Sequence, residues 1–478
     1  MKYKKKELIN GIAWSAIEKL IVVILQLSLE LILARNLLPK DYGIMGIVAI
    51  FISLGTLFAE GGFSNALIHN LQRNNDDFST AFYFNIFISV FFVIIFFSTA
   101  PVIAEYFKIP VLVNVLRVTS LSIIFGAASM VYRTKLSIDL DFKTQAKVSF
   151  IALIISGTIG VIMAISNYGV WSLVAQVVLQ NVIVFLLFVV FVRWLPNLSF
   201  SLLSFKKLIS FGSSILMAGL LQNLYSSLYN LLIGKRYSTD VLGLYSKSNQ
   251  FTLMPSALIS GILQRVMFPY FATFQSNDKK IFYTNQIFSR IVCIVVFPIF
   301  IYLAVFAEPL VFYGLSDKWI KAVPIIQILA IAFMFQPLIV NNMVLFQVKN
   351  KTKLYFWLEL ITKITGITIL FLTIKGGIYL ISLGILLQLF LQFLITGFSI
   401  NFILREKIYL QFLLLLRYLI YGVLCFLILF SFMNYFNLSK LHYWEFGSVI
   451  FLVLYILFYW VFEKDNILTI FSLLKNKN

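Results

Sequence analysis

The stretch from residue 78 to 103, FSTAFYFNIFISVFFVIIFFSTAPVI, contains no Asp, Glu, Lys or Arg. A transmembrane helix needs about 20 mostly apolar residues, because each residue rises about 1.5 Å through a hydrocarbon core about 30 Å thick. This run is long enough to cross the membrane. The whole chain is similarly rich in apolar residues and poor in charged ones. Of its 478 residues 61% are hydrophobic and 12% are charged, whereas a soluble domain is nearer half apolar and a quarter charged. The composition excludes a soluble globular protein, a disordered chain and a nucleic-acid-binding protein.

Apolar runs separated by polar breaks predict an all-α polytopic membrane protein with fourteen transmembrane helices. The predicted spans are 11–34, 43–61, 78–103, 111–132, 147–166, 169–192, 207–233, 242–263, 284–307, 321–346, 354–374, 376–403, 412–433 and 442–462. The loops between them are too short to hold a folded soluble domain.

The net charge of +19 indicates how the chain is oriented in the membrane. When fourteen spans alternate, most of the 38 Lys and Arg residues fall in the segments that share a side with the N-terminus. Cytoplasmic loops collect Lys and Arg. We therefore expect both termini to be cytoplasmic.

Three sequence echoes, in the same order in each half and at nearly constant offset, predict an internal repeat. The echoes pair Arg35 and Gly43 with Arg236 and Gly243, Ala100-Pro101 with Ala307-Glu308-Pro309, and Leu116-Arg117-Val118 with Ile326-Gln327-Ile328. Six spans per copy is an even number, so both copies keep one orientation, as in parallel-repeat transporters. The predicted domains are a six-helix bundle over 1–200, a second over 201–405, and two extra helices with a tail over 406–478.

Short motifs along the chain resemble those of Wzx-type polysaccharide flippases. The stretch Arg35–Gly43 reads Arg-x-Leu-x-Pro-x-Asp-Tyr-Gly and is similar to the loop after that family's first span, while Glu60–Ile68 is similar to the end of its second helix. Further matching markers are Asp141-Phe142-Lys143, Phe268-Pro269 and Asp317-Lys318-Trp319. The resemblance is to exporters of lipopolysaccharide, colanic-acid or teichuronic-acid units, and it identifies no particular sugar.

The resemblance implies a fold, a substrate and a location. The fold would be that of the MOP superfamily, to which MATE transporters also belong. The substrate would be undecaprenyl diphosphate carrying an oligosaccharide repeat unit, moved by alternating access from the cytoplasmic to the outer leaflet of the bacterial plasma membrane. Glycosyltransferases and a polysaccharide polymerase of the same pathway would be partners. The two extra helices would border the path of the polyprenyl tail.

Cationic side chains within the spans are candidates for binding a diphosphate, since Arg and Lys complement phosphate in a low-dielectric cleft. They are Lys19, Arg117, Lys247, Arg290 and Lys363. Other roles stay open for several of them. Arg117 and Lys247 could reach the outer interface, and Arg290 could belong to the inner charges that set topology. Lys363 could be neutralised by Glu359, four residues earlier.

Four residues are candidates for cation or proton coupling or for a polar cleft, because carboxylates inside a membrane are usually functional. They are Gln26, Glu30, Glu60 and Glu359. Gln26 and Glu30 share one helical stripe with Lys19. Equally, Glu30 could pair with a neighbouring cation and Glu60 could lie at the aqueous end of its span.

Aromatic and amide side chains suggest where a glycan could be contacted. Gln222, Tyr225 and Tyr229 share one face of the seventh span. Such residues also form ordinary polar contacts between membrane helices.

Two other functional classes stay open. A MATE-like, cation-coupled drug or metabolite antiporter predicts twelve functional spans and a carboxylate-rich cation site. A membrane glycan polymerase or acyltransferase predicts a long outer catalytic loop, which the chain lacks. The two histidines, His69 and His442, have no metal-ligand pattern around them, and no Walker loop is present. We expect no enzymatic activity, no metal and no cofactor.

Overall fold

A backbone inside hydrocarbon must satisfy its own N–H and C=O groups, so long apolar runs form helices. The computed structural model describes residues 22–404, 409–435 and 440–462, and within these ranges it contains helices and no strand. Twelve described segments are long and apolar enough to cross a membrane, and they coincide with predicted spans 2 to 12 and 14. The predicted all-α membrane fold is confirmed.

Predicted spans 1 and 13 are not among these twelve segments. Span 1 is helical from residue 22 to 36, and its earlier part, with Lys19, lies outside the described residues. Span 13 is the helix α16 (Tyr409–Tyr435), which includes the apolar stretch Leu415–Ile428.

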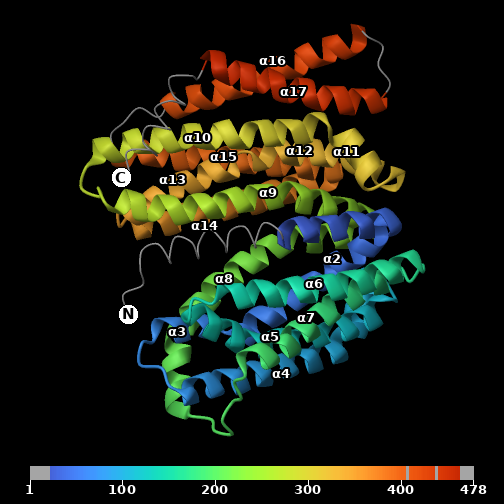
Figure 1. Ribbon diagram of the computed structural model, residues 1–478, viewed down its shortest axis with the longest axis vertical. Coiled ribbons are helices and arrows are strands. Elements are labelled where there is room, and N and C mark those ends of the chain that lie inside the picture. Colours follow the sequence, from blue (N-terminus) through green and yellow to red (C-terminus); the bar gives the residue numbers. More distant parts are fainter. Residues whose placement is uncertain (1–21, 405–408, 436–439, 463–478) are drawn as a thin grey trace. The chain divides into compact units, whose positions relative to one another are not determined.

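The chain divides into two compact units, Met1–Ser246 and Lys247–Asn478. The helices of the first unit are α2 (Pro39–Glu60), α3 (Phe63–His69), α4 (Asn75–Phe107), α5 (Leu112–Ile138), α6 (Phe142–Ile165), α7 (Val170–Val192), α8 (Leu202–Arg236) and the first turns of α9 (Thr239–Ala272). In this unit α5 packs against both α4 and α7, and α6 packs on α7 (Figure 1).

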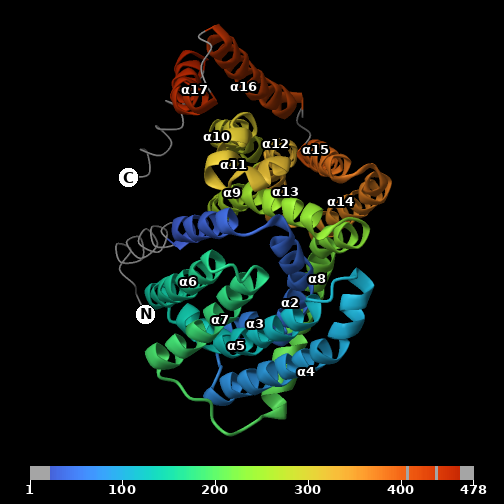
Figure 2. The ribbon, with the colours of Figure 1, turned by 90° about the vertical axis from the view of Figure 1, so that its right-hand side faces the viewer.

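The second unit contains the rest of α9 and the helices that follow it. They are α10 (Asp278–Val305), α11 (Ala307–Gly314), η1 (Asp317–Ala322), α12 (Val323–Phe333), α13 (Gln336–Val348), α14 (Thr352–Thr373), η2 (Ile374–Gly376), α15 (Ile378–Leu404), α16 (Tyr409–Tyr435) and α17 (Lys440–Phe462). The last two helices pack on each other and on α10 (Figure 2). The division into bundles of residues 1–200 and 201–405 stays a prediction.

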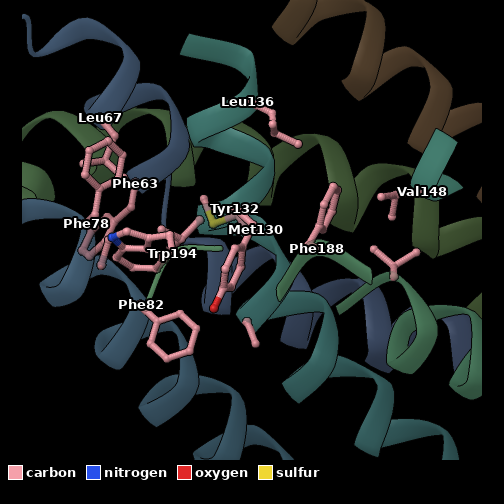
Figure 3. Close-up of a cluster of buried hydrophobic side chains, with 14 of the residues drawn as sticks. Phe63, Leu67, Phe78, Phe82, Met130, Tyr132, Leu136, Val148, Phe188 and Trp194 are labelled. Carbon is pink, nitrogen blue, oxygen red and sulfur yellow. The ribbon is translucent and has the colours of Figure 1, made fainter. Parts of the chain in front are cut away.

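Trp194, which follows α7, lies in an aromatic core of the first unit. Its ring centroid is 6.3 Å from Phe78, 6.1 Å from Phe82 and 5.4 Å from Tyr132, each in an edge-on arrangement (Figure 3). Edge-on aromatic pairs add to the stabilisation that burial provides. Lys135 Nζ lies 4.3 Å from the Phe78 centroid and 4.7 Å from that of Trp194, so cation–π contact holds this cation at the core.

The loop after Trp194 is fixed to the first turns of α4 by hydrogen bonds. The Trp194 indole N–H donates to Asn75 Oδ1 at 3.0 Å. The Asn197 backbone N–H donates to Ser79 Oγ at 2.9 Å, and that of Ser201 donates to Thr80 Oγ1 at 3.0 Å. Polar residues that open α4 therefore supply acceptors to a segment that makes no helical bonds of its own.

The tenth predicted span, 321–346, is not one continuous helix. The structure breaks it between α12 and α13, just before Pro337. Proline has no N–H, so the carbonyl four residues earlier, on Phe333, loses its helical partner. The Ser256 hydroxyl of α9 donates to that carbonyl at 2.9 Å. Hydropathy alone missed the break because both sides of it are equally apolar.

Pro298 in α10 also leaves a carbonyl without a helical hydrogen-bond donor, and a side chain from another helix supplies the donor. The carbonyl that Pro298 leaves free belongs to Ile294, and the Tyr459 hydroxyl of α17 donates to it at 3.0 Å. Near the other end of α17, the Tyr302 and Ser448 hydroxyls lie 2.9 Å apart. These bonds attach the final helix to α10.

We expect Tyr459→Phe to destabilise the protein by about 0.5–2 kcal/mol, the range of hydrogen bonds between membrane helices. The reason is that Ile294 O would be left without a donor. Tyr455→Phe on the same helix is the matched control, because the buried Tyr455 hydroxyl makes no hydrogen bond within the part of the chain that the structure describes. Thermal unfolding of the two purified variants in detergent checks this, and equal midpoints would contradict the role of Tyr459.

Candidate functional site

Two glycines allow α2 and α9 to cross with their backbones in contact. A Cβ on Gly43 would overlap the carbonyl oxygen of Thr239, and a Cβ on Gly243 would overlap that of Pro39. Each Cβ would also lie 3.1 Å from the backbone nitrogen of the other glycine. The contact is reciprocal: Gly43 and Gly243, like Pro39 and Thr239, are 200 positions apart in the sequence. The reciprocal contact therefore joins residues that the predicted repeat makes equivalent.

Asp41 anchors the start of α2 beside this crossing. Its carboxylate accepts a hydrogen bond from the Leu38 backbone N–H at 3.0 Å, which caps the helix. Asp41 Oδ1 would also be 3.3 Å from a Cβ on Gly169, which precedes α7 and has a φ of 56°. A residue with a side chain would be strained at that φ. The Asp-Tyr-Gly motif thus fixes both the cap of α2 and its approach to α7.

Polar side chains of α8 face α2 within the first unit. The Ser53 hydroxyl donates to Asn223 Oδ1 at 3.3 Å, and the Ser227 hydroxyl approaches the same oxygen at 3.4 Å. Tyr225 and Tyr229 meet edge-on with centroids 6.2 Å apart. Of the three candidates for glycan contact, the structure therefore brings Tyr225 and Tyr229 together, while Gln222 is exposed.

Arg117 lies in the first turns of α5 and reaches α4. Its Nε donates to the Phe97 carbonyl at 3.1 Å, and its guanidinium carbon is 5.8 Å from the Phe97 ring centroid. That carbonyl is the one that Pro101, inside α4, leaves without a helical donor. Arg117 therefore satisfies a backbone group, a role that its place in the sequence did not reveal.

The second unit contains a similar contact at the position that the repeat predicts. Gln327, the counterpart of Arg117 in the sequence echo, donates its amide N–H to the Ala304 carbonyl at 3.2 Å. Ala304 lies in the last turn of α10, where carbonyls lack helical donors. The same position in each half thus supports the end of the preceding span, once with a charged side chain and once with a neutral one.

Lys247 is the most deeply buried of the candidate cations that the structure describes, with 1% of its surface exposed. Its ammonium group lies 3.3 Å from Gln250 Oε1 and 5.2 Å from the Phe251 ring centroid. A lysine inside a membrane is costly and is usually functional. Arg290 is half-buried in α10.

Lys363 and Glu359 form an ion pair within α14, with 3.3 Å between Nζ and Oε2. Their side chains are 25% and 31% exposed. The neutralising pair that their spacing allowed is therefore present.

The remaining acidic and amide candidates lie toward the surface of the first unit. Gln26 is exposed and Glu30 is half-buried, close enough to Tyr42 to interact electrostatically. Glu60, the last residue of α2, is exposed and lies within electrostatic reach of Arg133. In the described ranges, no group of three or more His, Cys, Asp or Glu side chains could hold a metal ion.

The sequence matches the family described as polysaccharide biosynthesis protein over residues 32–324. The match covers more than half of the chain. The chain belongs to this family. Family motifs already described, Arg35–Gly43 and Glu60–Ile68, lie within the matched region.

Individual relatives are distant in sequence and similar over most of their length. This family member is 23% identical to the teichuronic acid biosynthesis protein TuaB of Bacillus subtilis, over 78% of this chain and 77% of the relative. It is 22% identical to the lipopolysaccharide biosynthesis protein WzxC of Escherichia coli, over 68% of this chain and 67% of WzxC.

Solved structures give the fold class. The lipid II flippase MurJ in an inward closed conformation superposes with a TM-score of 0.78 at 14% identity, covering 95% of this chain and 100% of MurJ. A MATE multidrug transporter of the MOP superfamily, inward-facing, superposes with a TM-score of 0.60 at 13% identity, covering 80% and 95%. The predicted MOP superfamily fold is confirmed.

We expect Gly243→Ala to destabilise the protein by about 1–3 kcal/mol, the usual cost of overpacking, because the new methyl group would meet backbone rather than a flexible side chain. Gly261→Ala, also in α9, is the matched control, since a Cβ there meets no atom within 4 Å. Alanine is favoured over glycine in a helix by up to about 1 kcal/mol, so the control should be neutral or stabilising. The test is thermal unfolding of both variants, and a wild-type midpoint for Gly243→Ala would contradict the backbone contact.

Proposed function

We propose that this protein is a flippase that moves undecaprenyl-diphosphate-linked oligosaccharide repeat units from the cytoplasmic to the outer leaflet by alternating access, for surface polysaccharide synthesis. The observation that carries the proposal is the combination of a polysaccharide biosynthesis family with the fold of a lipid II flippase. The protein is a membrane transport protein and not an enzyme. Its place would be the bacterial plasma membrane, with both termini cytoplasmic and with polymerase and glycosyltransferases of the pathway as partners.

The extent of the structural matches favours a flippase over a drug antiporter. MurJ covers 95% of the chain, whereas the MATE transporter covers 80%. The difference is close to the length of the two extra helices and tail, residues 406–478. A flippase for a lipid-linked substrate must accommodate a long hydrocarbon tail, and the extra helices are suited to border its path.

The crossing of α2 and α9 would lie at the outer end of the membrane when the N-terminus is cytoplasmic. In this structure the backbones of α2 and α9 are in contact there, between Gly43 and Gly243. Release of a head group to the outside would require the two helices to separate. Glycines suit such a contact, because the two helices could separate without any side chain having to move out of the way.

The candidate residues are assigned from their surroundings. Lys247 is the cation that we expect to contribute most to diphosphate binding, because it is the most deeply buried candidate among the described residues and a lysine inside a membrane is usually functional. Arg290 and Lys363 would add positive charge, the latter partly neutralised by Glu359. Lys19, outside the described residues, stays a proposed cleft cation.

Coupling and glycan contact stay separate proposals. Glu30 and Glu60 would serve proton or cation coupling, with Gln26 and Glu359 as polar cleft residues. Gln222, Tyr225 and Tyr229 would contact sugar rings, since aromatic faces and amides are common glycan ligands.

A strain that lacks this protein should accumulate undecaprenyl-diphosphate oligosaccharide in its membranes and lose surface polysaccharide. Wild type should restore both, and Lys247→Met, which removes the charge but keeps a long side chain, should restore neither although it reaches the membrane in normal amount. Lys247→Arg, which keeps the charge, is the control and should restore part of the export. The measurement is mass spectrometry of extracted lipids beside quantitation of the polymer. Normal levels of both, with changed sensitivity to toxic cations, would favour the antiporter instead.

Two substitutions of Arg117 distinguish a structural role of this residue from a substrate-binding role in the same assay. We expect Arg117→Gln to keep most of the export, because a glutamine amide can donate to Phe97 O as Gln327 donates to Ala304 O. Arg117→Leu, which has no donor, should lose most of it. If the positive charge itself binds the substrate, both variants should fail equally.

A further inference from the structure

The first unit contains an apolar pocket of about 270 Å³ among α2, α3, α4 and α8. Its walls include Phe58 from the end of α2, Phe84 and Phe92 from α4, and Ile209, Ser213 and Leu216 from α8. Ser213 is the one polar side chain in the wall, and its hydroxyl approaches the Ser210 carbonyl of its own helix at 3.4 Å. The pocket therefore offers almost only hydrocarbon and aromatic surface.

The Gly61-Gly62 turn shapes the pocket. Both glycines have positive φ, and a Cβ on Gly62 would overlap the backbone of Gly212 in α8. This contact holds α8 against the end of α2. Stacked rings brace the walls: Phe58 on Phe92 with centroids 5.1 Å apart, and Phe63 on Phe84 with centroids 4.7 Å apart. The Glu60–Ile68 motif, of which only Glu60 was given a role above, thus contributes Gly61 and Phe63 to this wall.

The size and position of the pocket suit a hydrocarbon chain. An apolar cavity of about 150 Å³ is enough to bind benzene, so this one can hold several branched carbon units. Its lining residues belong to helices that cross the membrane. At the rim, Phe91 is 51% exposed, which leaves a way in from the surrounding lipid.

Helical spacing places a cation on the side of α8 that lines the pocket. Lys206 is exposed and precedes Ile209 by about one helical turn, and it shares a face of α8 with Ser213, seven residues later. Lys207 is equally exposed but about 100° further round the helix. Of the acids on neighbouring segments, Glu60 interacts with Arg133, and Asp76 accepts hydrogen bonds from Asn197 and Ser199. Basic groups beside pockets between membrane helices are typical binding sites for anionic lipid head groups.

We propose that this pocket binds the isoprene units nearest the head group of a polyprenyl diphosphate lipid, with the diphosphate beside Lys206. The inference rests on the proposed function, and it places a second lipid contact in the first unit, whereas α16 and α17 belong to the second. The occupant is an anionic prenyl lipid because the apolar walls and the cation together match both of its parts.

The test uses the purified full chain in nanodiscs of phosphatidylethanolamine and phosphatidylglycerol. The probe is undecaprenyl diphosphate with a diazirine in the isoprene units next to the diphosphate, followed by mass spectrometry of labelled peptides. We expect labels within 84–92 and 209–216, competed by unlabelled undecaprenyl diphosphate. Ser213→Trp, which fills the pocket, should reduce labelling severalfold. Leu221→Trp, at an exposed position of the same helix, should not.

A matched pair of substitutions tests the proposed position of the diphosphate. Lys206→Gln should reduce labelling severalfold more than Lys207→Gln, since by helical spacing Lys206, and not Lys207, lies on the side of α8 that lines the pocket. Equal effects of the two substitutions, equal competition by added phosphatidylglycerol, or labels confined to α16 and α17 would each overturn the inference. These results are independent of lipid accumulation in the deletion strain, so failure of the pocket and failure of the proposed function can be told apart.

Discussion

Each proline inside a membrane helix leaves one carbonyl without its N–H partner, and hydrocarbon offers no replacement. In this chain a side chain from another helix donates to that carbonyl in three places, through Arg117, Ser256 and Tyr459. These bonds join α5 to α4, α9 to α12 and α17 to α10. The helix pairs are therefore specified by polar geometry, although nearly all of the surface they bury is apolar and would fit many partners.

Glycines impose the complementary constraint on α2. At the start of this helix, Gly43 lies against the backbone of α9, and just beyond its end Gly62 lies against the backbone of α8. Both positions belong to motifs that resemble the flippase family. A helix held by backbone contact at each end is positioned without large side chains.

Hydropathy and charge predicted most of the fold, because a span of about 20 apolar residues has few alternatives to a membrane helix. Hydropathy did not predict the break before Pro337, because the apolar composition is the same on both sides of it. The candidate site was less predictable. Position in a span suggested that Arg117 is a cleft cation, and this stays a prediction. Its hydrogen bond to the Phe97 carbonyl could not be predicted, because sequence spacing does not reveal a neighbour on another helix. The Lys363–Glu359 pair could be predicted because both residues lie on one helix.

The attachment of α17 has a consequence for truncation. Because Tyr459 supplies the donor that Ile294 lacks, and Tyr302 meets Ser448, the last helix completes the hydrogen bonding of α10. Without α17, the carbonyl that Pro298 leaves free would lose this donor. A chain shortened before residue 440 should therefore tolerate the loss of α17 better when residue 298 has a backbone N–H.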